Sequence, residues 1–141
     1  MKHGLWTLLL LVACSGETAP THEHPIRTSY EDDGGEIGWY VSDATFMKTP
    51  EWKFDGESSA PLGMPSAYQS AYGWLKKTFP KMSGFTVRSY GLSTAGSSRA
   101  PNRWYYTFDF VGDLDGSMVM NSRFSVMVLM DGSVVEPRKI K

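Results

Sequence analysis

The sequence predicts an α+β domain, with one main helix packed on an antiparallel sheet of about four strands, preceded by a signal peptide and a flexible tether. Residues 66–79 place apolar side chains at the three- and four-residue spacing of an amphipathic helix. Three later segments, 85–90, 104–111 and 124–130, alternate with the period of two that a half-buried strand requires. Ahead of them, an apolar run ends at the only cysteine of the chain.

Residues 1–13 have the layout of an export signal. Lys2 gives a positive start, the run from residue 5 is apolar apart from Thr7, and a small residue, Ala13, ends it. A membrane-spanning helix needs about 20 apolar residues, and this run is less than half as long. We therefore expect it to be removed and not to serve as a mature anchor.

Leu11, Val12, Ala13 and Cys14 resemble the lipobox of bacterial lipoproteins. The resemblance implies that Cys14 takes a diacylglycerol thioether, becomes the new N-terminus and holds the chain at a membrane, since two or more acyl chains anchor well. Ser15, in place of aspartate, resembles the sorting pattern for the outer membrane of a two-membrane bacterium. The alternatives are a plain signal peptide with an incidental cysteine, or an unprocessed N-terminal helix. A reactive thiol at Cys14 is a further alternative, but it would need a nearby base or helix dipole to lower the pKa of the thiol.

The mature chain is predicted to have three parts. Residues 14–36 are small, polar, acidic and proline-containing, and predict a flexible acidic tether. Residues 37–57 hold too many aromatic side chains to be left in water, and predict an ordered arm with a short strand at 39–41. The arm is expected to pack on an α+β domain formed by residues 58–141.

The two halves of the mature chain carry opposite charge. Residues 14–57 hold ten acidic and three basic side chains, a net charge of −7, whereas residues 58–141 hold five acidic and ten basic ones, a net charge of +5. One interpretation is that the basic half faces acidic lipid or a wall polymer. The other is that the acidic half folds against it or solvates a linker. Nucleic acid is excluded as a natural partner if the export signal is real.

The main helix is expected to begin at Ser66, because Ser66 and Gln69 fit a capping box. Two lysines in the last turn suit the helix dipole, and Pro80 ends the helix. Gly73 lies inside the helix, where glycine costs about 1 kcal/mol relative to alanine. We therefore expect Gly73 to permit close contact with the sheet.

The strands are expected to present one face to the helix. Asp131-Gly132 predicts a tight hairpin that returns the last long strand to a short final one. The side chains expected to lead the helix-facing side are Trp104, Phe108, Phe124 and Val128.

The opposite face of the last long strand is rich in methionine. Met127 and Leu129 point away from the helix, and Met118 and Met120 lie just upstream. Because methionine surfaces adapt to varied partners and exposed apolar patches mark recognition sites, these four residues are the candidate partner-binding patch. The alternative is that the arm at residues 37–54 covers this face as ordinary core.

A second resemblance concerns residues 60–140. The order of a helix followed by strands, with the stretches RWYYTFDF and FSVMVLMDGSVVEP, is similar to PepSY-like and cystatin-like small domains of exported bacterial proteins. In those domains a helix packs across a curved antiparallel sheet. The resemblance implies a non-catalytic module that binds or restrains a protein or peptide.

Residues suited to catalysis or metal binding are few. His22 and His24 fall in the predicted tether, so a histidine-based triad is not expected and any metal site there would be weak. The stretch 112–117 lacks the third acid and the closing glutamate of a calcium loop. Asp109, the only acid within a predicted strand, is expected to form a cross-strand pair with Arg88. No enzyme, cofactor or metal is therefore predicted.

The functional prediction is a lipid-anchored, extracytoplasmic, non-catalytic binding module of the cell envelope, with an envelope or secreted protein as its partner. The first alternative is a carrier that holds a small ligand in an aromatic cleft between helix and sheet, and the second is a structural envelope lipoprotein. The residues that would line the carrier's cleft are Tyr68, Tyr72, Trp74, Trp104 and Tyr106.

Overall fold

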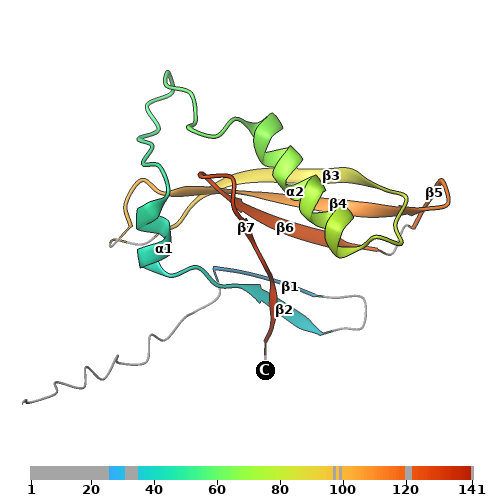
Figure 1. Ribbon diagram of the computed structural model, residues 1–141. Helices are drawn as coiled ribbons and strands as arrows, with labels where there is room; N and C mark the ends of the chain where they lie inside the picture. Colours follow the sequence, from blue (N-terminus) through green and yellow to red (C-terminus); the bar gives the residue numbers. More distant parts are fainter. Residues whose placement is uncertain (1–25, 31–34, 97, 99, 120–121, 141) are drawn as a thin grey trace, which may run out of the picture.

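The structure, a computed structural model, describes residues 26–30, 35–96, 98, 100–119 and 122–140 (Figure 1). The predicted signal peptide at 1–13, Cys14 and most of the predicted tether lie outside these residues.

An antiparallel sheet of five strands forms the centre of the fold, one strand more than the predicted number of about four. Its order is β3-β4-β6-β7, and β5 pairs with the far end of β4. The strands are β3 (Gly84–Thr94), β4 (Trp104–Leu114), β5 (Ser117–Met118), β6 (Phe124–Leu129) and β7 (Val134–Val135). The helix α2 (Met64–Thr78) lies across one face of this sheet, which confirms the α+β class (Figure 1).

A second, smaller sheet lies on the opposite side from α2 (Figure 1). Its order is β1-β2-β8, and the short helix α1 follows β2 in the chain. The elements are β1 (Arg27–Tyr30), β2 (Glu36–Trp39), β8 (Arg138–Lys139) and α1 (Asp43–Lys48). β1 occupies part of the range 14–36 that was predicted as tether. It is ordered there because its backbone pairs with β2 along the whole strand, from Arg27 opposite Trp39 onward.

Helix α2 begins two residues before the predicted start, at Met64 instead of Ser66. Its N-cap is Gly63, which makes no side-chain capping bond, so the predicted capping box is wrong. Pro65 in the first turn explains the earlier start, because its fixed φ suits a helix and its missing N–H needs no partner there. The two lysines do lie in the last turn.

Gly73 lies on the exposed side of α2, and a Cβ built on it meets no atom within 4 Å. The expectation of close contact with the sheet is therefore wrong. The helix instead meets the sheet through three fully buried side chains, Ala67, Ala71 and Leu75.

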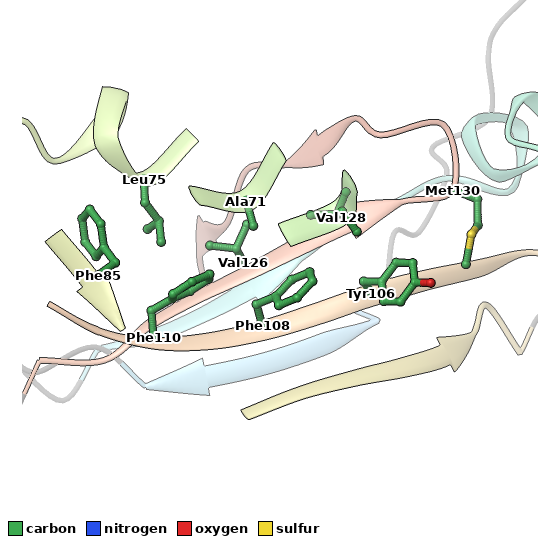
Figure 2. Close-up of a cluster of buried hydrophobic side chains, with 10 residues drawn as sticks. Ala71, Leu75, Phe85, Tyr106, Phe108, Phe110, Val126, Val128 and Met130 are labelled. Carbon is green, nitrogen blue, oxygen red and sulfur yellow. The ribbon is translucent and has the colours of Figure 1, made fainter. Parts of the chain in front are cut away.

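The core between α2 and the sheet follows the predicted alternation. Figure 2 shows side chains of β4 and β6 directed toward the helix, with Phe108 and Val128 almost completely buried. Trp104 and Phe124 pack at the margin of the same cluster. The members shown and labelled are Ala71, Leu75, Phe85, Tyr106, Phe108, Phe110, Val126, Val128 and Met130.

The tight two-residue turn occurs at Asp115-Gly116 and not at the predicted Asp131-Gly132. Asp115 and Gly116 both have positive φ, 51° and 80°, as a type I′ turn requires, and they join β4 to β5. At the second site only the glycine has positive φ, 86°. There Leu129 N–H donates to Ser133 C=O across a three-residue loop, so this hairpin is the bulged type.

Candidate functional site

The predicted methionine patch is not a surface. Met127 and Leu129 are 0 % and 2 % exposed, inside a second core cluster with Trp39, Phe46 and Tyr105. The arm covers this face of the sheet because its own aromatic side chains are buried there. β2 places Trp39 and α1 places Phe46 against Met127 and Leu129. The alternative of ordinary core therefore describes this face.

The other members of the predicted patch do not join Met127 and Leu129. Met118 is 48 % exposed and lies in β5, beside the Asp115-Gly116 turn at the end of β4. Met120, like Cys14, lies outside the described residues. The four residues are thus not brought together on one surface.

A different surface, between the N-terminal half of α2 and β3, has the features of a binding site. It is a half-open, mainly apolar groove of about 280 Å³. It exists because α2 packs chiefly over β4 and β6 and leaves the outer strand β3 partly uncovered. The lining residues are Met64, Pro65, Tyr68, Gln69, Val87, Tyr90 and Phe108.

A row of exposed apolar side chains follows β3 along this groove. Val87, Tyr90 and Leu92 are 39 %, 61 % and 37 % exposed. Their partners on β4 include Phe108 and Phe110, which face the helix, so all three lie on the α2 side of the sheet. An irregularity in the pairing between Val87 and Ser89 keeps Val87 and Tyr90 on one face although they are three residues apart.

The outer edge of β3 is open. Among the described strands, β3 pairs with β4 alone. Ala95 N–H donates to Arg103 C=O at 2.8 Å, and hydrogen-bonded and non-hydrogen-bonded pairs alternate from there along an antiparallel ladder. Tyr90 and Leu92 therefore direct their N–H and C=O groups away from β4, toward the open edge.

The groove lies in a part of the chain that has no acidic residue. Residues 58–108 contain six Lys and Arg and no Asp or Glu. Lys76 Nζ donates to the carbonyls of Met82 and Ser83, both at 3.1 Å. Lys77, Lys81 and Arg88 are exposed. β3 itself carries one charged side chain, Arg88, while Asp109 and Asp113 of the neighbouring β4 accept hydrogen bonds from Ser89 and Thr86.

The predicted aromatic cleft between helix and sheet is filled. Tyr106 is 5 % exposed, its hydroxyl donates to Leu62 C=O at 2.9 Å, and burial raises the pKa of this hydroxyl. Trp104 Nε1 donates to Trp52 C=O at 2.8 Å. Tyr72 and Trp74 pack against the core, and only Tyr68 of the five predicted residues lines the groove.

Asp109 pairs with Arg27 and not with Arg88, so the predicted pair is wrong. The irregular pairing before Ser89 places Ser89, not Arg88, opposite Asp109. Arg27 Nη2 instead reaches both carboxylate oxygens from β1, at 3.2 Å each, and Ser89 and Ser125 donate hydroxyls. Burial alone would raise the pKa of Asp109, but these hydrogen bonds and the arginine charge outweigh it and lower the pKa. The arrangement is an inter-sheet ion pair.

Other predicted positions give no further site. Within the described ranges, no three His, Cys, Asp or Glu side chains are grouped to hold a metal ion. The stretch 112–117 runs from the end of β4 through the tight turn into β5, and His22 and His24 lie outside the described residues. No helix in the described part of the chain is long and apolar enough to cross a membrane.

Comparison with protein-family models, curated proteins and solved structures finds no match for this chain. The similarity to PepSY-like and cystatin-like domains stays a prediction.

Most of the groove residues were not predicted, although the sequence of β3 contains one signal for them. In the segment 85–94 the apolar positions shift from odd to even numbers, from Phe85 and Val87 to Tyr90 and Leu92. Such a change of phase marks a bulge. It would have placed Tyr90 and Leu92 on the helix side of the sheet.

Proposed function

We propose that this chain is a lipid-anchored, extracytoplasmic, non-catalytic binding module that holds a segment of another envelope or secreted protein. The observation that carries the proposal is the open apolar groove between α2 and β3. The lipobox residues and the order of a helix followed by strands, similar to small domains that bind or restrain proteins, support the same function.

The open shape of the groove favours a protein segment over a small ligand. Sites for small molecules usually have volumes of about 300–1,000 Å³ and bury most of the ligand surface, whereas this groove of about 280 Å³, at the lower end of that range, is half open. That volume suits one or two apolar side chains. The rest of the space between helix and sheet is filled by core side chains, so the predicted carrier cleft is not formed there.

The anchor would hold the groove near the membrane. If Cys14 is lipidated, the chain from Cys14 to β1 reaches at most about 45 Å when fully extended. β1 would then lie within that distance of the bilayer. This fits a module that acts on other envelope proteins or on proteins that pass along the envelope.

A photo-reactive residue in the groove tests the proposal. Benzoylphenylalanine replaces Tyr90 in native cells, and in a control strain it replaces Thr45, an exposed residue of α1. We expect a discrete protein adduct from position 90 and none of the same mass from position 45. The adduct should disappear when Val87→Lys is added, because a lysine there blocks the groove.

The captured segment then provides a direct binding test. Mass spectrometry of the adduct identifies the residues attached to position 90, and a synthetic peptide of that segment is titrated against purified protein. We expect Val87→Lys to weaken peptide binding by at least about tenfold, which corresponds to about 1.4 kcal/mol. A position-90 strain with no adduct, or a peptide that binds both proteins equally, would favour a structural envelope protein instead.

A further inference from the structure

We infer that the partner segment joins the β3 edge as an additional strand, and that it carries acidic side chains next to the apolar ones that enter the groove. This inference rests on the proposed function and names the chemistry of the partner. It combines the open backbone edge, the apolar row and the charge around them.

The backbone of β3 is prepared for strand addition. From Ser89 to Thr94 the strand has six residues in regular register with β4 and none of them is charged. Natural edge strands are usually protected by charge, proline or a bulge. Here the irregularity at Arg88 protects only one point, and Tyr90 and Leu92 offer their N–H and C=O groups beyond it.

The side chains define the pattern of the incoming strand. Alternate residues of a strand point to the same face, so every second side chain of an added strand would lie on the α2 side. There it meets Tyr90 and Leu92, and the groove bounded by Tyr68 and Val87 accepts one large apolar group. The partner pattern is therefore apolar, any residue, apolar.

The charge selects an acidic segment. Arg88, which lies in β3 itself, is exposed and forms no ion pair within the described residues. Aspartate or glutamate beside the apolar positions would approach its guanidinium, whereas a basic segment would be repelled. A second copy of β3 is a poorer fit because it brings Arg88 and no acidic residue.

A random peptide display library is the probe, selected on the purified protein without residues 1–14 and counter-selected on Val87→Lys. We expect enriched peptides to carry two apolar residues separated by one position, with Asp or Glu beside them. Hydrogen exchange of the complex should show new protection of the amides of Tyr90 and Leu92, because those N–H groups would enter a ladder.

Two matched variants separate backbone from side-chain effects. Leu92→Pro removes an N–H that points to the open edge, which an edge strand tolerates, while Leu92→Ala removes only the side chain. We expect Leu92→Pro to weaken binding of the enriched peptide at least about tenfold more than Leu92→Ala. Thermal unfolding of both variants checks that they are folded. Arg88→Glu should weaken it several-fold and reduce the salt dependence of binding.

The outcomes distinguish this inference from the proposed function. Equal affinities for Leu92→Pro and Leu92→Ala would overturn strand addition while leaving groove binding intact. Failure to enrich any peptide that depends on Val87 would overturn both. Enriched peptides without acidic residues would overturn the charge requirement.

A dimer that is seen by sedimentation and is lost in Leu92→Pro would assign the edge to a second copy. Binding to phosphatidylglycerol vesicles that Arg88→Glu abolishes, with peptide binding unchanged, would assign Arg88 to lipid.

Discussion

Arg27 and Asp109 lie 82 positions apart in the chain, yet Arg27 Nη2 is 3.2 Å from each carboxylate oxygen of Asp109. The pair joins β1 of the smaller sheet to β4 at the centre of the larger one. Ser89 and Ser125, on the strands flanking β4, donate to the same carboxylate. The ion pair therefore links β1 directly to the central strand of the larger sheet.

This pair should make stability depend on pH in the acid range. Because the folded pKa of Asp109 is lowered, its contribution is present above the unfolded pKa of about 3.9 and is lost as pH falls through the folded pKa. We expect the wild type to lose more unfolding free energy than Asp109→Asn as the pH falls below the unfolded pKa of about 3.9. Urea unfolding at each pH measures this.

The comparison must leave Asp55 unchanged in both proteins. Hydrogen bonds from the backbones of Ser58 and Glu57 and from the Ser58 hydroxyl lower the pKa of Asp55 to about 2, so it titrates in the same range. Identical pH profiles of the wild type and Asp109→Asn would show that the ion pair does not stabilise the contact between the sheets.

The two described methionines of the predicted patch should respond oppositely to a charge. Met127→Asp buries a carboxylate in a fully closed cluster, and we expect a loss of about 3–5 kcal/mol or failure to fold. Met118→Asp, at a half-exposed position, should change stability by less than about 0.5 kcal/mol. Urea unfolding of both variants measures this, and a stable Met127→Asp protein would mean that this face is open.

Gly73 is a position where the sequence is not optimal for stability. A methyl group there meets nothing within 4 Å, so Gly73→Ala should raise the free energy of unfolding by about 0.5–1 kcal/mol through helix propensity alone. Gly112→Ala is the contrasting variant, because its Cβ would lie 2.9 Å from a Phe124 ring atom. Thermal unfolding should move the two midpoints in opposite directions, and a lower midpoint for Gly73→Ala would contradict its exposed placement.

The local periodicities of the sequence were enough to predict the main helix, the three long strands and the side of the sheet that the helix covers. Each of these follows from alternation or helical spacing within about ten residues. Phe108 and Val128 are buried where that spacing places them.

The missed features depend on residues distant in sequence. Arg27 stands in a polar segment and becomes part of a strand only because β2 and Asp109 supply its partners. The groove depends on how far α2 extends over the sheet, and this cannot be predicted from the local spacing of apolar residues. The predicted pair of Asp109 with Arg88 was wrong because a single irregularity beside Arg88 changes the register of β3 against β4.

Two phenylalanines of the arm provide the sharpest test of how the second face is covered. Phe46 in α1 is 1 % exposed, whereas Phe54 is 66 % exposed. We expect Phe46→Ala to cost about 3–5 kcal/mol and Phe54→Ala less than about 1 kcal/mol, as measured by urea unfolding. The difference arises because only Phe46 fills the cluster that contains Met127 and Leu129.

The same pair of variants separates the covered face from the groove. At temperatures where Phe46→Ala is still folded, loosening of the arm should expose Met127 and Leu129, increase binding of an apolar dye and promote self-association. The affinity for a groove-binding peptide should stay unchanged, because Tyr90 and the α2 side of β3 lie on the opposite face of the sheet. Loss of peptide binding in folded Phe46→Ala protein would instead place the binding surface on the arm.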